Sequence, residues 1–327
     1  LPVGAFTWTG NGFPRTWYCG VSAPPACHLP VRPGEGPLRL DAVDNSRSHQ
    51  ICGQVTDSPA DAHGPGMTSI SISEYGPNQA DVDLAPHREF AESLTGVLSY
   101  LSAAVHHGWK VKLQPTEPWV AVPRKRHVRV DVKGFHLHWV PLTRSEMAAG
   151  VTSPLRTVLD CARVLPFDEA LAVADSALRS GMVTNNDLEA AAAAARGPGA
   201  IAARRVARYA DGRAKNPMES VLRALALGAG IELTPQFVVA EPGFFAQADL
   251  GSEKLRLAVE ADGFEFHGTR SGLKKDCIRH TGYALHGWAS LRFSYEDIFF
   301  SPAWVVWVFR TWLTGEFTTP PKRNVAA

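Results

Sequence analysis

The sequence predicts an α/β (α+β) protein in which a helical and small α/β region precedes a C-terminal domain built on a four-stranded sheet. Three observations support this prediction. Four helical segments follow one another over residues 151–212, a capped helix begins after Asn216, and three short apolar strands, a helix and a fourth strand come after it. The 327 residues exceed the usual length of one compact domain, so we expect separate units.

The composition is that of an ordinary globular protein. Hydrophobic residues make up 45% of the chain and charged residues 20%, and the formal net charge of +1 means that any affinity for nucleic acid has to come from local basic patches. The sequence has no run of about 18 apolar residues and no secretory signal at its start. We therefore expect a cytoplasmic protein without a membrane segment.

The cysteines favour reduced thiols over a disulfide framework, because they are an odd number spread through a long chain. A zinc site built from part of this set and His28 has no CxxC pair to support it, and we set it aside. The five residues are Cys19, Cys27, Cys52, Cys161 and Cys277.

Residues 1–87 are rich in Pro, Gly and Ser, and only TSISIS at 68–73 shows the alternation typical of a strand. The chain begins with Leu1 and its first methionine is Met67, so part of this segment could be an upstream or shifted-frame translation. We expect the segment to be poorly ordered.

Residues 88–150 are predicted to form a small α/β region. EFAESLTGVLSYLSAAVHHGW has apolar residues at helical spacing up to Gly108, and WVAVP and FHLHWVPL are typical of short strands. Between these strands, PRKRHVRV carries a basic cluster that could contact phosphates or could form a solvated turn. The cluster consists of Arg124, Lys125, Arg126 and Arg129.

Residues 151–212 are predicted to form a bundle of four helices. The first begins with Ser153 as the N-cap and Pro154 at the first helical position. The last carries Arg204, Arg205 and Arg208, and such an arginine face is either solvated or a contact for DNA.

Residues 213–316 are predicted to form the C-terminal domain, and 317–327 a tail. In NPMESVLRALALGAGI, Asn216 caps the helix, Pro217 takes its first position and Glu219 falls at the third, a variant of the capping box. TPQFVV, FFAQADL and LRLAVEADG then predict three strands, and a helix through ALHGW leads to a fourth strand, ASLRFSYEDI.

Acidic residues end two of these strands. Asp249 closes the second, Glu260 closes the third, and Asp262 lies on the same face as Glu260 if the third strand continues. Carboxylates at one edge of a small sheet repel each other unless a cation neutralises them, and Mg²⁺ prefers oxygen ligands. The pattern indicates a metal site that could polarise a phosphodiester and activate water.

Basic residues follow the acids in GFEFHGTRSGLKKDCIRH. His267, Lys274, Lys275 and Arg279 could hold a scissile phosphate and the charge that develops on it. Asp276 and Arg279 lie three residues apart on a predicted helix, where a surface ion pair is the plainer interpretation.

The order NPMES, QADL, VEADGFEFHG, KKDCIRHTGYALHGW and LRFSYEDI resembles a family of unknown function related to the very-short-patch repair endonucleases, within the PD-(D/E)XK superfamily. The resemblance is strong over the last third of the chain and weaker over TSPLRTVLD. It extends to actinobacterial proteins that carry an AbiEi-like antitoxin domain ahead of the nuclease-like part. The matching residues are Glu219, Asp249, Glu260, Asp262, His267, Asp276 and Arg279.

The resemblance implies a restriction-endonuclease-like domain with a central mixed four-stranded sheet flanked by helices, and a Mg²⁺-dependent endonuclease acting on DNA in repair or defence. Mn²⁺ could replace Mg²⁺ at Asp249 and Glu260. Asp262 stands where the superfamily has its motif lysine, so His267, Lys274 or Lys275 would stabilise charge. The predicted catalytic residues are Glu219, Asp249, Glu260, Asp262, His267 and Lys274, and the predicted phosphate-binding residues are Lys275, Arg279, Arg124 and Arg126.

Several of these residues also have structural explanations. Glu219 at the third helical position satisfies the cap, and Asp262 before Gly263 is a common turn signal. The alternative function is a non-catalytic DNA-binding or antitoxin-like regulatory protein on a nuclease scaffold, with a toxin or another protein as partner.

Overall fold

The computed structural model of the protein describes residues 6–8, 15–17, 82–128, 134–262 and 270–324. The chain divides into two units, Leu1–Gly66 and Met67–Ala327. In the first, β1 (Phe6–Trp8) pairs antiparallel with β2 (Arg15–Trp17). The sequence did not indicate these two strands, because strands of three residues are too short to show an alternation. TSISIS and most of the segment 1–87 lie outside the described residues.

The second unit begins with a small α/β region. Its elements are α1 (Ala85–Ser93), β3 (Val97–Leu98), α2 (Tyr100–His106), β4 (Trp119–Pro123), β5 (His136–Val140) and α3 (Arg144–Ala149). β3 pairs antiparallel with β4, and β4 pairs parallel with β5. The two predicted strands, β4 and β5, are confirmed.

The helical pattern predicted up to Gly108 is wrong as a single helix, because β3 interrupts it between α1 and α2. The interruption depends on a close approach between Gly96 and β4. A Cβ atom at Gly96 would lie 2.7 Å from the carbonyl oxygen of Ala121. Pairing with β4 therefore overrides the local helical periodicity.

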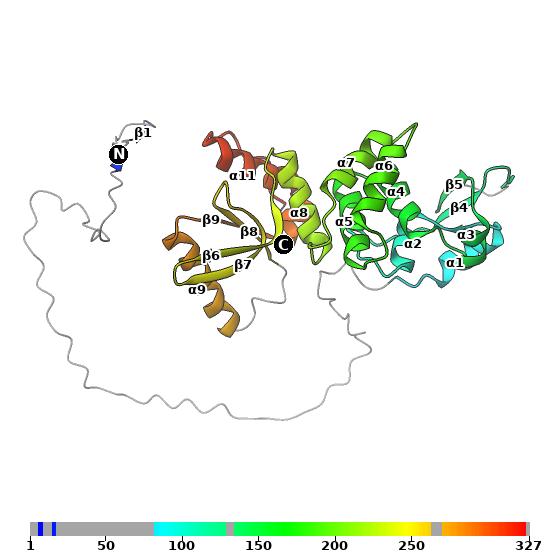
Figure 1. Ribbon diagram of the computed structural model, residues 1–327, viewed down its shortest axis with the longest axis horizontal. Coiled ribbons are helices and arrows are strands. Elements are labelled where there is room, and N and C mark those ends of the chain that lie inside the picture. Colours follow the sequence, from blue (N-terminus) through cyan, green and yellow to red (C-terminus); the bar gives the residue numbers. More distant parts are fainter. Residues whose placement is uncertain (1–5, 9–14, 18–81, 129–133, 263–269, 325–327) are drawn as a thin grey trace, which may run out of the picture. The chain divides into compact units, whose positions relative to one another are not determined.

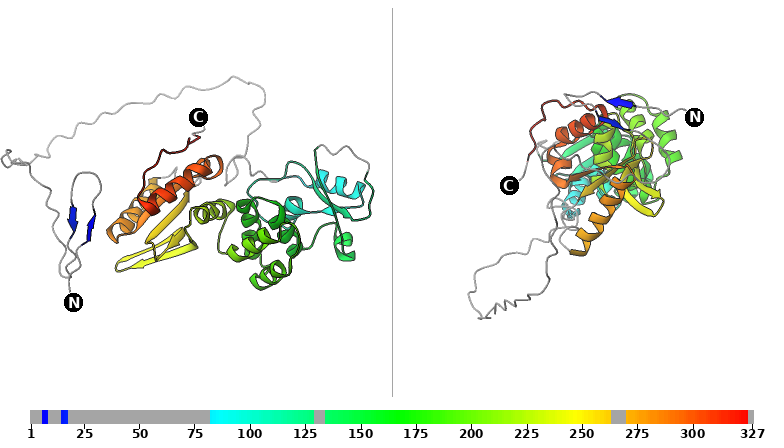
Figure 2. Two further views of the ribbon diagram at one scale, coloured as in Figure 1. Left: turned by 90° about the horizontal axis from the view of Figure 1, so that it is seen from above. Right: turned by 90° about the vertical axis from the view of Figure 1, so that its left-hand side faces the viewer.

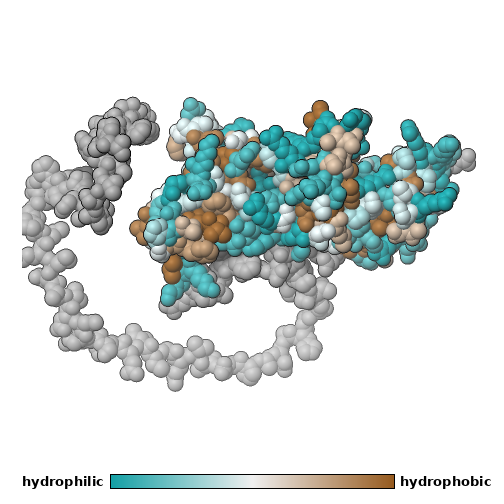
Figure 3. All heavy atoms as spheres, in the orientation of Figure 1, coloured by the Kyte–Doolittle hydropathy of each residue, from teal (hydrophilic) through white to brown (hydrophobic). Residues whose placement is uncertain are grey.

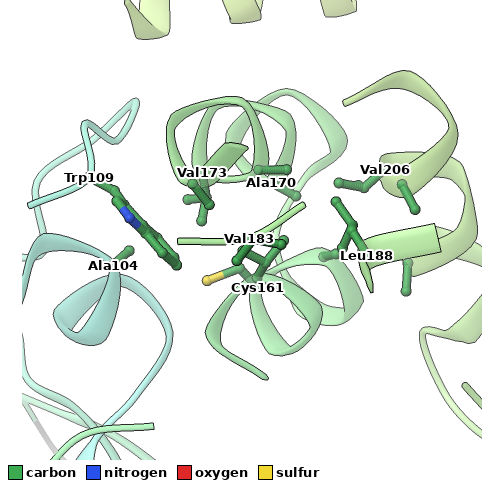
Figure 4. Packing of buried hydrophobic residues seen from close by; sticks show 14 of the residues in the cluster. Ala104, Trp109, Cys161, Ala170, Val173, Val183, Leu188 and Val206 are labelled. Atoms are coloured by element: carbon green, nitrogen blue, oxygen red, sulfur yellow. The ribbon is translucent and has the colours of Figure 1, made fainter. Parts of the chain in front are cut away.

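The four predicted bundle helices are confirmed as α4 (Pro154–Val164), α5 (Phe167–Arg179), α6 (Asn185–Ala194) and α7 (Ala200–Tyr209). Pro154 begins α4 as predicted, but the Ser153 side chain makes no capping hydrogen bond. Small side chains let the helices pack closely, and Cys161 and Ala203 are completely buried. Figure 4 shows this core running from Ala104 and Trp109 through Cys161 to Leu188 and Val206.

The C-terminal part contains the predicted mixed four-stranded sheet in the order β6-β7-β8-β9. β6, β7 and β8 are antiparallel neighbours, and β9 runs parallel to β8 after the crossover through α9. The elements are α8 (Pro217–Gly228), β6 (Thr234–Glu241), β7 (Phe244–Ser252), β8 (Leu257–Asp262), α9 (Arg270–Leu285), β9 (Ala289–Ser294), α10 (Tyr295–Phe300) and α11 (Pro302–Thr314).

Helices cover both faces of this sheet (Figures 1 and 2). On one face, α8, α10 and α11 pack on strand residues such as Leu250 and Phe293, whose ring lies 5.2 Å from that of Phe309. On the other, Tyr283 of α9 and Trp288 pack on residues of β6, β7 and β8. These two apolar layers hold the strand ends in fixed positions.

The predicted fourth strand is too long at its C-terminal end. β9 stops at Ser294 because this residue caps α10 in a capping box with Asp297. The segment YEDI is therefore helical and not extended.

A buried ion pair joins the bundle to the C-terminal part. Arg223 of α8 donates through Nη2 to both carboxylate oxygens of Asp175 on α5, at 2.6 and 2.8 Å. Asp175 also accepts from the Asp211 backbone N–H at 2.7 Å, and Arg223 donates to the Tyr209 carbonyl. The pair fixes α8 against α5.

The exposed apolar side chains are scattered. On the face that Figure 3 shows, they form separate patches among hydrophilic residues. Within the described ranges, none of the helices combines the length and the apolar character that crossing a membrane requires.

Candidate active site

Three elements bring acidic side chains together: the first turn of α8 with Glu219, β7 with Asp249 and β8 with Glu260. Leu250 and Val259 are paired across the antiparallel ladder, so the next residues outward, Asp249 and Glu260, are neighbours. The side chain of Asp249 accepts a hydrogen bond of 2.9 Å from the Ala261 backbone N–H.

Asp249 and Glu260 were predicted to end their strands, and this prediction is wrong for both. β7 continues to Ser252 because residues 250–252 pair with residues 257–259, and β8 continues to Asp262 because β9 pairs with its whole length. The conditional expectation for Asp262 is confirmed, since the strand does extend to it. The acids therefore sit on the rigid part of the sheet and not in its turns.

Glu219 is almost completely buried, with 2% of its surface exposed. Asn216 accepts from the Glu219 backbone N–H at 2.9 Å, while Glu219 Oε1 accepts from the Asn216 side chain and Oε2 from the Lys215 backbone. Gln236 donates a further hydrogen bond to Oε2 at 2.9 Å. Burial first, and the charge of Asp249 second, raise the pKa of Glu219 to about 7. Glu219 thus both supports the helix cap at Asn216 and lies near Asp249.

Glu260 is the least satisfied acid of the group. It is 3% exposed, and within the described residues its Oε1 has no hydrogen-bond partner. Burial and then Asp249 raise its pKa to about 8, although Arg279 opposes the rise. Burial also raises the pKa of Asp249 itself. A carboxylate in this position needs a proton or a cation.

Arg279 of α9 forms an ion pair with Glu260 in the described structure. Its Nη1 lies 3.4 Å from Glu260 Oε1, within ion-pair distance but without hydrogen-bond geometry, and its Nε is buried without a partner. Its Nη2 donates to Asp276 at 3.0 Å. The predicted Asp276–Arg279 pair is confirmed, but it is not a plain surface pair, because Arg279 also reaches the buried acid.

A second arginine was missed by the sequence interpretation. Arg292 of β9 donates to both oxygens of Asp262, at 2.6 and 2.9 Å, and lies 3.4 Å from Asp276. The parallel register places Arg292 opposite Glu260. An arginine within the apolar strand ASLRFS was the available signal, because such a residue needs a carboxylate nearby.

Two chemically active groups of α9 were also missed. The Tyr283 hydroxyl is buried close to the Glu260 carboxylate but makes no hydrogen bond of full geometry in the described structure, and burial followed by the charge of Glu260 raises its pKa. His280 Nδ1 lies 2.8 Å from Ser290 Oγ, and burial and then Arg292 lower its pKa. Their helical spacing of three gave no distinct signal in the sequence.

Within the described ranges, the remaining predicted residues form no ion pair or hydrogen bond with Glu219, Asp249 or Glu260. Lys274 and Lys275 are exposed on α9. Arg124 and Arg126 are exposed in the turn after β4, on the three-stranded sheet. His267 and Arg129 fall outside the described residues. The residues considered for a zinc site, Cys19, Cys27, His28 and Cys52, also fall outside them.

Two uncharacterized proteins of Mycobacterium tuberculosis are similar to this chain, MT2308 of strain CDC 1551 / Oshkosh and Rv2248 of strain ATCC 25618 / H37Rv. Each is 32% identical over 170 residues, which are 50% of this chain and 63% of the relative. The chain thus spans less than two thirds of the length of these relatives. No family model and no solved structure matches the chain. The family that the sequence motifs resemble stays a prediction.

The donors at Asp249 and Glu260 fit a hard divalent cation. Within the described ranges no three His, Cys, Asp or Glu side chains gather closely enough to hold a metal ion by themselves. Mg²⁺ does not require such a cage, because it keeps several waters and is usually bound through one or two carboxylates. Glu260, whose Oε1 accepts no hydrogen bond in the described structure, and its neighbour Asp249 supply two carboxylates.

Proposed function

We propose that residues 213–316 form a Mg²⁺-dependent DNA endonuclease that hydrolyses phosphodiester bonds in DNA repair or defence, with Mn²⁺ able to replace Mg²⁺. The observation that carries the proposal is the buried Oε1 of Glu260, which accepts no hydrogen bond in the described structure, beside Asp249. The order of acids on a helix and two strands of a mixed sheet is also the order in the family that the sequence resembles.

The energetics of the acids support a cation site. Burying several ionised carboxylates side by side is strongly unfavourable, and here Asp249 and Glu260 adjoin a third acid, Glu219. The arrangement lowers stability unless a proton or a cation neutralises it. Strongly raised pKa values of acids that share a site are a common feature of functional sites.

Asp249 and Glu260 would hold the cation. When bound, it would polarise a phosphodiester oxygen and lower the pKa of a water molecule. Glu219, with a pKa of about 7, can take up or release a proton near neutral pH. Asp262, held by Arg292, keeps that guanidinium at the end of β8. Arg279 and the exposed Lys274 and Lys275 would bind phosphate, and His267 stays a proposed partner in charge stabilisation.

The competing function is a non-catalytic DNA-binding or regulatory protein, with a toxin or another protein as partner. One observation favours it: Arg279 and Arg292 already balance part of the acidic charge of Glu260, Asp262 and Asp276. In that case the acids and arginines would form a structural network, and metal would be unnecessary.

Cleavage of supercoiled plasmid and of short mismatched duplexes distinguishes the two functions. The wild-type protein is compared in Mg²⁺, Mn²⁺ and EDTA with Asp249→Asn, Glu260→Gln and the control Glu253→Gln, whose side chain is exposed in the β7–β8 turn. The nuclease proposal expects metal-dependent cutting by wild type and control, and loss in the two site variants. Absence of cutting by all four stable proteins would support the scaffold function.

A further inference from the structure

Four arginines gather around the turn between α6 and α7, away from the acidic site. Arg196 lies in the turn, and Arg204, Arg205 and Arg208 lie on α7 at helical positions that share one side. All four are exposed. Because the whole chain has a net charge of only +1, this concentration of positive charge is a local feature.

These guanidinium groups are held in place by uncharged partners. Arg196 donates to the carbonyls of Ala193 and Ala195 at 2.8 and 3.0 Å, and Arg204 donates to the Ala195 carbonyl at 3.2 Å. Arg205 lies 3.9 Å from the ring centroid of Phe167, and Arg208 lies 5.3 Å from that of Tyr209. Carbonyls and ring faces orient an arginine but leave its full charge.

Three other exposed or partly exposed arginines pair with carboxylates. Arg213 pairs with Asp211 at 2.6 Å, Arg256 with Glu241 at 2.8 Å and Arg323 with Asp297 at 2.6 Å. In the described part of the chain, no carboxylate lies within ion-pair distance of the four arginines around α7. The four arginines around α7 therefore present a cluster of uncompensated positive charge to an anionic partner.

The backbone under these arginines is fixed. The other face of α7 is anchored in the bundle core through Ala203 and Val206 (Figure 4). Gly199, in the turn before α7, has a positive φ of 75°, and a Cβ there would lie 2.5 Å from the Arg163 carbonyl oxygen. The turn therefore packs against the end of α4, and the arginines project from a rigid support.

We propose that Arg196, Arg204, Arg205 and Arg208 bind the phosphate backbone of double-stranded DNA and hold the substrate for the C-terminal domain. Arg204 and Arg208 are separated by about 6 Å along the helix axis, so two phosphates can be contacted in succession. The planar fork of arginine suits bidentate contact with phosphate. The role as a substrate-holding surface rests on the proposed nuclease function, whereas binding of duplex DNA does not.

The test is fluorescence anisotropy of a labelled duplex titrated with the full chain in EDTA at several salt concentrations. Arg204→Gln/Arg205→Gln/Arg208→Gln is compared with wild type and with a control, Arg88→Gln/Arg144→Gln/Lys322→Gln, which removes the same number of charges from exposed side chains elsewhere. A third variant, Arg124→Gln/Lys125→Gln/Arg126→Gln, tests the competing basic turn. Loss of three phosphate contacts should weaken binding and lower the slope of log K against log salt by about 3. The control should keep most of the wild-type affinity and slope.

Equal DNA affinity of wild type and the α7 variant would overturn the proposal. Loss of DNA binding in the basic-turn variant alone would also overturn it. Preference of the α7 surface for RNA or for an acidic polypeptide over duplex DNA would also overturn it. Plasmid cleavage measured in parallel separates this outcome from failure of the nuclease function. If the protein binds duplex DNA through α7 but does not cut it, the binding proposal stands and the nuclease proposal fails. If the wild-type protein cuts DNA and the α7 variant binds DNA normally, the nuclease proposal stands and the binding proposal fails.

Discussion

Arg279 Nη1 lies 3.4 Å from Glu260 Oε1, yet the two atoms do not form a hydrogen bond. The guanidinium therefore balances charge without satisfying the carboxylate. In a purely structural network every buried polar atom would be hydrogen-bonded. The missing hydrogen bond therefore favours a site that accepts a cation.

Arg279→Gln is expected to increase affinity for divalent metal by about tenfold, because removing one nearby positive charge lowers the repulsion that an entering cation meets. The measurement is the rise in melting temperature with Mn²⁺ concentration, since a ligand of the folded state stabilises it. Arg279→Lys keeps the charge and serves as the control. A weaker response of the glutamine variant would show that Arg279 supports the cation and does not compete with it.

The buried acid should make stability depend on pH. The pKa of Glu260 is raised from 4.5 to about 8, so the folded state binds this proton more tightly than the unfolded chain. Its contribution is complete below pH 4.5 and is lost as the pH rises through about 8. Relative to Glu260→Gln, wild-type protein in EDTA should lose roughly 1 kcal/mol per pH unit across this window.

Urea unfolding at a series of pH values measures this difference. Glu253→Gln is the control and should follow wild type, because its side chain is exposed. Parallel curves for wild type and Glu260→Gln would mean that Glu260 titrates normally and that its burial has no energetic consequence.

Asp175→Asn should destabilise the chain by about 3–5 kcal/mol, because it leaves the buried Arg223 guanidinium without a countercharge. Arg256→Gln breaks the more exposed pair with Glu241 and should change the unfolding free energy much less than Asp175→Asn does. Equilibrium denaturation compares the two. Similar small losses in both variants would show that the Asp175–Arg223 pair does not hold α8 against α5.

The sequence was most informative where local chemistry decides the structure. Asn216 and Pro217 marked the start of α8, and short apolar runs marked β6, β7 and β8, because caps and periodicity act over a few residues. The break at Gly96 was not predictable, since it depends on pairing with the distant strand β4.

The same limit applies to the candidate site. The acids Glu219, Asp249 and Glu260 were predicted from their places at strand and helix ends. Their contacts with Gln236 and Arg279 were not, because these arise only when α8, β6, β8 and α9 pack together. His267 lies outside the described residues, so its role stays a prediction.

A calorimetric titration of Mn²⁺ into the DNA-free protein tests the central claim most directly. Wild type and Glu253→Gln should bind the ion with the same affinity, and Asp249→Asn and Glu260→Gln should each lose it while keeping their folded far-ultraviolet spectrum. Absence of binding to the wild-type protein, or equal binding by all four proteins, would contradict a metal centre at Asp249 and Glu260.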